Sequence, residues 1–422
     1  MITMLALLLG LIATGTAVFL ALGVTATSLL FVEGHSLGGI AQILVDRLNS
    51  STLTAIPFFV TAATFMQRGG MAAALVNAAE AWIGGFRGGV AIVAVAAAAL
   101  FASVSGSSTA TALALGTILL PALAQRGYPA RFSAGLVGAS ATLGILLPPS
   151  LALIVFSLIA EVSVRKLFVA GLIPGLIQGA LFIVWILFVT RRMQLIVPPK
   201  RLPLREKLRL TYEVIPAMLV PIVALGGIYS GIVTLSEASA LAALVAIVIC
   251  VLNGTCRGLR ILAWVGDAVI AASAILILVG VAVLLGHWIV LSGVAERLVS
   301  WFQQSGVTPL QFLLAMNLVM FVLGMFLEII STILITLPIV LPLLGPLGIN
   351  PVHYAIVVIV NMELAALTPP VGLNLFVMKS VSQLPIATVM RGFIPFVALL
   401  LILLALVTLF PPLSLWLPER LQ

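Results

Sequence analysis

Four short segments of small, polar and proline residues interrupt long apolar stretches of this sequence. They are SGSS at 105–108, LPP at 147–149, EIIST at 328–332 and TPPVG at 368–372. Serine hydroxyls and freed backbone carbonyls are hard oxygen ligands that suit Na⁺, and the N-terminus of a half-helix can receive a carboxylate. The four segments therefore predict sites for a cation and for an organic anion.

The segments are expected to act in pairs. One Na⁺ site is predicted from residues 105–108 together with the turn 142–148, and a second from the Glu328 region together with residues 368–372. An anionic substrate is expected between the two pairs, with Asn374 as a candidate polar contact. Hydrogen bonding between membrane helices explains any single serine equally well, so the prediction depends on the cluster as a whole.

Two acidic residues, Glu328 and Glu363, lie within apolar sequence. An acid inside a membrane segment is costly, and it is a functional candidate for that reason. The alternative is a structural carboxyl that is protonated or hydrogen-bonded. His287 and His353 have no acid near them at helical spacing, so they are expected to be packing or interface residues.

The composition indicates a membrane protein. Of the 422 residues, 63% are hydrophobic and 8% are charged, against about 25% charged residues in an average soluble domain. The net charge of +8 is attributed to cytoplasmic loops rather than to nucleic-acid binding, because seven basic residues and one acid fall within 191–209. Cys250 and Cys256 show no metal-ligand pattern and are expected to be ordinary thiols.

Uncharged stretches locate the expected membrane helices. Residues 2–32 predict a first transmembrane helix rather than a cleaved signal, because no basic region precedes the apolar run. The uncharged stretch between Arg87 and Arg126 is too long for one crossing, and the serine cluster at its centre predicts a re-entrant hairpin. The other expected elements are 52–66, 132–160, 166–190, 214–232, 237–253, 268–292, a second long apolar region at 309–345, 352–378 and 392–416.

The sequence also contains an internal repeat. A shift of 221 residues superimposes six prolines and glycines without a gap: Pro121, Gly127, Pro148, Pro149, Gly171 and Pro174 fall on Pro342, Gly348, Pro369, Pro370, Gly392 and Pro395. Five crossings are expected between the two hairpins, an odd number that gives the repeats opposite orientations. Inverted repeats with discontinuous helices are typical of secondary transporters.

These observations predict an all-α integral membrane protein with inverted repeats, two re-entrant helical hairpins and proline-broken helices. Four parts are expected: an N-terminal scaffold helix and connecting segment at 1–51; a first repeat at 52–190, with hairpin 1 at about 89–125 and a broken helix at 132–160; a basic loop and central scaffold helices at 191–260; and a second repeat at 261–422, with hairpin 2 at about 309–345, a broken helix at 352–378 and a last helix.

Two long segments, 105–150 and 324–377, resemble the large membrane subunit of TRAP transporters, the DctM type within the ion transporter superfamily. IPFF at 56–59, RGGVA at 87–91 and SEA at 236–238 are also similar to that family. The resemblance covers roughly residues 52–410. It implies elevator-type, Na⁺-driven uptake of a carboxylate-bearing anion across the bacterial inner membrane. The implied partners are a small four-helix membrane subunit (DctQ type) and a periplasmic substrate-binding protein (DctP type), with no cofactor besides Na⁺.

The resemblance also implies roles for individual residues. The implied Na⁺ ligands are Ser103, Ser105, Ser108, Gly144, Leu147, Pro148, Gly324, Thr368 and Gly372, of which Leu147 and Pro148 would act through their carbonyls. The candidate substrate contacts are Ser107, Thr109, Thr142, Glu328, Glu363 and Asn374.

Three other functions are open at this point. An intramembrane serine protease would need a base, and neither histidine lies in a recognisable partner motif, so no enzyme activity is expected. A Na⁺- or H⁺-coupled anion transporter of the same superfamily that works without a binding protein is the nearest alternative. A passive channel is the third, although inverted repeats with broken helices favour alternating access.

Overall fold

The computed structural model describes residues 2–34, 37–193 and 202–421, and every regular element within these ranges is a helix. Seven of these helices are long and apolar enough to cross a membrane: Ser108–Gln125, Ala130–Ala160, Val164–Thr190, Leu204–Ser230, Leu235–Leu252, Leu259–Leu291 and Ile386–Leu409. The predicted all-α membrane class is therefore confirmed.

The N-terminal region differs from its prediction. Instead of one helix over 2–32, the structure has α1 (Ile2–Ala13) and α2 (Val18–Val32), which pack against each other. Gly15 takes a left-handed φ of 81° between them, and the Thr14 hydroxyl donates to the Leu11 carbonyl at 2.6 Å. A left-handed residue cannot continue an α-helix, so the uncharged run is divided in two. The 3₁₀ turn Leu37–Gly39 and the short helix α3 (Ile40–Leu48) follow.

The first repeat consists of eight helices: α4 (Ser51–Arg68), α5 (Met71–Ile83), α6 (Gly89–Ser105), α7 (Ser108–Gln125), α8 (Ala130–Ser140), α9 (Leu143–Leu146), α10 (Leu151–Ala160) and α11 (Val164–Thr190). Helices α6 and α7 form the first hairpin. Helices α8 to α10 form the broken helix, interrupted at residues 147–150.

Three long helices connect the repeats: α12 (Leu204–Ser230), α13 (Leu235–Leu252) and α14 (Leu259–Leu291). They begin earlier than predicted, because charged and polar residues at their N-termini continue the helix outside the apolar run. At 1.5 Å per residue, the 33 residues of α14 extend about 50 Å, which exceeds the hydrocarbon core of a bilayer. Part of the predicted basic loop, residues 194–201, lies outside the described residues.

The second repeat contains α15 (Val294–Ser305), α16 (Pro309–Gly324), α17 (Ile329–Leu344), α18 (Pro351–Ala366), α19 (Leu373–Ser382), α20 (Ile386–Leu409) and α21 (Pro412–Arg420). The predicted last helix over 392–416 is in fact two helices. Helix α20 ends at Leu409 because Pro411 and Pro412 follow, and proline cannot continue a helix.

The element bounds follow the repeat closely. Adding 221 to the first residues of α7 and α8 gives 329 and 351, the first residues of α17 and α18. Gly127 and Gly348, also 221 apart, are both left-handed, with φ of 77° and 66°. Even non-glycine residues obey the relation, since Glu161 and Gln383 have positive φ one position from exact equivalence. The two halves therefore share a backbone plan.

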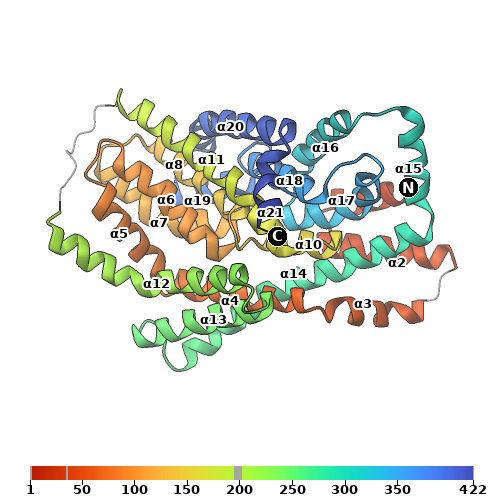
Figure 1. Cartoon of the computed structure of the whole chain (residues 1–422), viewed down its shortest axis with the longest axis horizontal. Helices are drawn as coiled ribbons and strands as arrows, with labels where there is room; N and C mark the ends of the chain where they lie inside the picture. The colour runs from red at the N-terminus through yellow and green to blue at the C-terminus, as the bar shows by residue number, and fades with distance from the viewer. Residues whose placement is uncertain (1, 35–36, 194–201, 422) are drawn as a thin grey trace.

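The helices form two groups. In Figure 1, α12, α13, α4, α14 and α3 extend along one edge of the molecule, and we call these five helices the outer layer. The hairpin core, α6–α11 and α16–α21, lies on the other side. Within the core, helices of opposite repeats pack together, as in the pairs α8–α20, α10–α17 and α7–α19. The two repeats are therefore interlaced rather than side by side.

Glycines allow the closest of these contacts. A Cβ atom on Gly135 of α8 would lie 2.1 Å from the carbonyl oxygen of Gly392 of α20. A Cβ on Gly171, the repeat equivalent of Gly392, would lie 2.3 Å from the carbonyl oxygen of Leu146. Small residues let membrane helices approach to backbone contact, which explains why glycine recurs at this position in both repeats.

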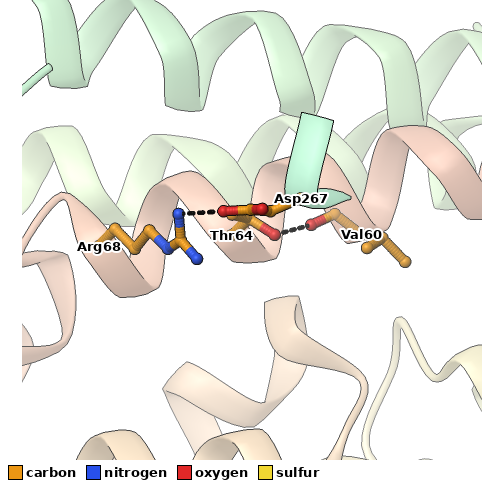
Figure 2. Close-up of polar contacts among 4 residues, drawn as sticks. All are labelled: Val60, Thr64, Arg68 and Asp267. Atoms are coloured by element: carbon orange, nitrogen blue, oxygen red, sulfur yellow. Dashed lines mark hydrogen bonds and ion pairs between the residues drawn. The ribbon is translucent and has the colours of Figure 1, made fainter. Parts of the chain in front are cut away.

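The outer layer is joined by polar contacts between α4 and α14, which Figure 2 shows. Arg68 at the end of α4 forms an ion pair with Asp267 of α14, with 2.6 Å between Nη1 and Oδ2. The guanidinium also lies 5.9 Å from the centre of the Trp264 ring. One turn earlier, the Thr64 hydroxyl donates to the Val60 carbonyl of its own helix at 2.8 Å.

Candidate functional site

The tip of the first hairpin is a turn between α6 and α7. Gly106 has a left-handed φ of 58°, and a Cβ there would lie 3.0 Å from Leu151 Cγ and 3.1 Å from Leu151 N. Any side chain at position 106 would therefore meet both steric and backbone strain. This close approach places the tip directly against the break between α9 and α10.

Hydroxyl groups of this tip bond mostly to one another. Ser105 Oγ lies 2.7 Å from Thr111 Oγ1, which donates to the Ser107 carbonyl at 2.8 Å. Ser107 is the N-cap of α7, and its Oγ accepts from the backbone N–H of Ala110 at 3.4 Å. The side chains fold inward within the tip and leave few of its hydroxyls without a partner.

Asn374 connects this tip to the second repeat. Its Oδ1 accepts from Ser108 Oγ at 3.2 Å, and its Nδ2 donates to the Gly138 carbonyl at 3.1 Å. Asn374 is fully buried, so this bridge is a polar link inside the hairpin core. The residue predicted as a substrate contact thus holds the first tip in place through Ser108.

The tip of the second hairpin has different chemistry. Glu328 is the N-cap of α17, and its Oε2 accepts from the backbone N–H of Ile330 at 3.0 Å. The Glu328 carbonyl also accepts from the Thr332 hydroxyl at 3.1 Å. A carboxylate at a helix N-terminus is stabilised by the helix dipole, so this helix end carries its own anion.

The second tip contacts the second break. The backbone N–H of Gly372 donates to the Met325 carbonyl at 3.0 Å. Gly372 has a φ of 53°, and a Cβ there would lie 2.7 Å from the Thr368 carbonyl oxygen. The Thr368 hydroxyl donates to the Leu364 carbonyl at 2.7 Å, which leaves its oxygen free to accept or coordinate. Each hairpin tip therefore adjoins one helix break.

Both tips line one cavity of about 160 Å³. Of the predicted site residues, Ser107, Ser108, Thr109, Gly324 and Glu328 line it, together with Gly106 and apolar side chains that include Ile145, Leu151, Ile275 and Met362. The N-terminus of α7 and the carboxylate that caps α17 thus open onto the same small space. Ile275 of α14 is the contribution of the outer layer.

Other predicted residues lie outside this cavity. Ser105, Pro148 and Gly372 are buried at the breaks and tips, and Leu147 and Thr368 are partly exposed beside them. Gly144 is buried in α9. The side chain of Ser103 lies outside the described part of the structure.

Thr142 and Glu363 are brought together, but away from the cavity. Both are fully buried, with 3.4 Å between Thr142 Oγ1 and Glu363 Oε2. Gln178 of α11 donates from Nε2 to Thr142 Oγ1 at 3.0 Å. Thr142 and Glu363 are 221 residues apart, so they are repeat equivalents in direct contact. Two equivalent positions meet in this way only near a two-fold axis.

Sequence reasoning missed several of these partners. Gln178 is a single amide within apolar α11, which was the available signal. Thr111 stands one helical turn after Ser107, at the spacing at which a hydroxyl can reach a backbone carbonyl. Met325 acts through its backbone carbonyl, for which the sequence contains no signal.

The histidines and cysteines lie outside the cavity. His353 is buried, with 2.9 Å between its Nδ1 and Ser414 Oγ. His287 lines a separate cavity of about 340 Å³ beside the ion pair of Arg47 and Glu161. Cys250 and Cys256 are free and buried. Among the described residues there is no group of three or more His, Cys, Asp or Glu side chains that could hold a metal ion.

Comparison with known proteins gives a consistent result. The sequence profile described as "Tripartite ATP-independent periplasmic transporter, DctM component" matches residues 5–413. The C4-dicarboxylate TRAP transporter large permease protein DctM of Pseudomonas aeruginosa is 39% identical over 400 residues, which is 93% of this chain and 92% of that protein. Its namesake from Vibrio cholerae is 34% identical over 443 residues, 99% of this chain and 97% of that protein.

A solved structure supports the fold. The YdaH transporter of Alcanivorax borkumensis is similar with a TM-score of 0.68 over 89% of this chain and 88% of that chain, at 13% sequence identity. At this identity the likeness shows the architecture alone. The profile match and the two permeases show the family: this chain belongs to the DctM family, the large membrane components of tripartite ATP-independent periplasmic transporters.

Proposed function

We propose that this chain is the permease of a Na⁺-coupled, binding-protein-dependent uptake system for a small carboxylate anion, and that it is not an enzyme. The observation that carries the proposal is the single cavity lined by both hairpin tips. Discontinuous helices that meet at one site near the centre of inverted repeats are the usual arrangement in secondary transporters. Family membership supports the same conclusion.

The anion is proposed to bind at the N-terminus of α7. Ser108 and Thr109 line the cavity within the first turn of this helix, where backbone N–H groups have no acceptor inside the helix. The corresponding end of α17 already holds the Glu328 carboxylate. The substrate carboxylate therefore belongs at the first tip, with Ser107 and Thr109 as contacts and Glu328 facing the rest of the molecule.

The coupling ions are proposed to bind where each tip meets its break. The first site would take oxygens of Ser103, Ser105, Ser108, Gly144, Leu147 and Pro148, and the second those of Gly324, Thr368 and Gly372. Support comes from the close approach of Gly106 to Leu151 and from the hydrogen bond between Gly372 and Met325. Thr142, Glu363 and Asn374, which are buried away from the cavity lining, are proposed to support these sites from beneath.

The cavity volume favours a small substrate. About 160 Å³ corresponds to roughly five water molecules at ~30 Å³ each. A four-carbon acid fits this space more readily than a large sugar acid. The two relatives compared above, both described as C4-dicarboxylate permeases, agree with this size.

The complete system is proposed to include a small four-helix membrane subunit and a periplasmic binding protein in the bacterial inner membrane. The hairpin core would carry the substrate in an elevator-like movement against the outer layer. The alternative is a transporter of the same superfamily that works without a binding protein. Co-purification of the small subunit with this chain distinguishes the two.

Uptake into proteoliposomes tests the proposal. The permease with its small subunit is reconstituted, and binding protein loaded with radiolabelled succinate is added outside. An inward Na⁺ gradient should drive accumulation, whereas a K⁺ gradient of equal size should not. Equal uptake under the two gradients would refute Na⁺ coupling. Equal uptake with and without the binding protein would favour the alternative.

A further inference from the structure

The contact between Thr142 and Glu363 places a carboxyl group at the pseudo-two-fold axis of the hairpin core. Glu363, Thr142 and Gln178 all have 0% exposed surface. Thr142 precedes the first break by five residues and Glu363 precedes Thr368 by the same number. The carboxyl therefore lies between the two break segments and below the cavity, in a position that the proposed transport chemistry does not use.

The hydrogen-bond geometry indicates that this carboxyl carries a proton. The Thr142 hydroxyl has one hydrogen and two lone pairs. Its shorter acceptor contact is the Ala139 carbonyl at 2.9 Å, against 3.4 Å to Glu363 Oε2, so the hydrogen goes to Ala139. One lone pair accepts from Gln178 Nε2. The other lone pair faces Glu363 Oε2, and a proton on Oε2 completes the set.

The remaining oxygens support the neutral form. Glu363 Oε1 and Gln178 Oε1 are both buried without a hydrogen-bond partner. An ionised carboxylate would thus leave a charged oxygen without a donor, which is far more costly than an unpaired neutral carbonyl. A Na⁺ ion would need several oxygens converging on one point, and two unpartnered oxygens fall short of that number. A proton needs only one oxygen.

No charged side chain replaces the proton. The helices that pack against α18 are α9, α10, α11, α16, α17, α19, α20 and α21. Their charged or titratable residues lie at helix ends: Arg165 and Lys166 on α11, Glu328 before α17, Lys379 on α19, Arg391 on α20, and Glu419 and Arg420 on α21, while α18 itself carries His353 and Tyr354. His353 stands ten residues before Glu363, a distance of about 15 Å along the helix. None of these residues has a described bond to Glu363.

We propose that Glu363 is a proton-binding site between the two break segments, in addition to the two Na⁺ sites. The proton resides on Oε2 and donates to Thr142. At high pH the O–H bond breaks, the proton passes to hydroxide to form water, and the carboxylate remains. The charge so created separates α9 from α18 at the point where both repeats position their ion-binding segments. The proton thereby holds the two segments together, and transport acquires a pH dependence.

Infrared spectroscopy of the purified complex in lipid tests the proton directly. A protonated carboxyl has a C=O stretching band that the ionised form lacks, and this band shifts in heavy water. The band should be present in the wild type at neutral pH, absent from Glu363→Gln, and lost from the wild type as the pH is raised. Glu213→Gln, which changes an exposed carboxyl paired with Arg209, should leave it unchanged. A wild-type spectrum identical to that of Glu363→Gln would overturn the proposal.

The pH profile of uptake tests the role in transport. At a fixed Na⁺ gradient, wild-type uptake should fall at alkaline pH, whereas Glu363→Gln, which is permanently neutral, should lose this decline. Thr142→Val removes the acceptor for the proton and should move the decline lower by about one pH unit, the size of one hydrogen bond. Thr142→Ser should restore it. Identical alkaline declines in the wild type and Glu363→Gln would refute the role. The infrared result requires no substrate, so its failure is distinct from a failure of the proposed function.

Discussion

The two hairpin tips have nearly the same backbone and opposite chemistry. At the first tip, a serine caps α7 and further hydroxyls bond within the tip or to Asn374. At the second tip, the carboxylate of Glu328 caps α17. The capping positions are 221 residues apart, so the difference lies in the side chain alone. The repeat therefore fixes where a helix end faces the cavity, and the cap decides whether that end is open to an anion.

Replacing the turn glycine at each tip should have the largest effect. Gly106→Ala and Gly372→Ala introduce a Cβ at 3.0 Å from Leu151 Cγ and 2.7 Å from the Thr368 carbonyl, both at positive φ. Each should reduce proteoliposome uptake at least about tenfold, because displacing a tip by even a short distance disrupts positioning. Gly179→Ala, with no atom within 4 Å of the new Cβ, is the control. If only one tip variant loses uptake, the tips are not equivalent in function.

Exchanging the caps tests the assignment of the anion to the first tip. Ser107→Glu should still cap α7 but would place a carboxylate where the substrate binds, and should raise the KM for the loaded binding protein about tenfold or more. Glu328→Ser should also retain a cap and should leave KM closer to the wild-type value. The measurement is initial uptake rate against loaded binding protein concentration. A larger KM effect at position 328 would reverse the assignment.

Removing one hydroxyl at each break or tip should have a moderate effect. Ser105→Ala and Thr368→Ala should each raise the Na⁺ concentration for half-maximal uptake by roughly fivefold, the equivalent of about 1 kcal/mol. Membrane insertion, followed by the yield of purified protein, should be unaffected. If the Na⁺ response is unchanged in both variants, neither hydroxyl takes part in ion binding.

The outer layer should respond least. Asp267→Asn breaks the ion pair with Arg68 (Figure 2), whose side chains are 53% and 43% exposed respectively. Exposed ion pairs contribute about 0–1 kcal/mol, so the thermal stability of the purified protein should change only slightly and uptake should remain near the wild-type rate. A strong loss of uptake would show that this contact takes part in the transport movement.

Prolines and glycines made much of the architecture predictable. Pro148, Pro369 and Gly106 interrupt helices wherever they occur in a sequence, and the repeat appears as a constant offset between them. The α1–α2 turn was missed, although Gly15 was a signal for it. The bridge from Ser108 to Asn374 and the contact of Gln178 with Thr142 could not be predicted. Such contacts depend on helix packing, which places residues far apart in the chain next to each other.

The interlaced repeats also constrain how the protein is made. Helix α8 of the first repeat presents Gly135 to a backbone that belongs to α20, near the end of the chain. During synthesis the helices of the first half can enter the bilayer, but their glycine-lined surfaces have no matching helix until the last part of the chain emerges. Neither half can therefore complete its packing alone, and the hairpin core assembles only after nearly the whole polypeptide has been inserted.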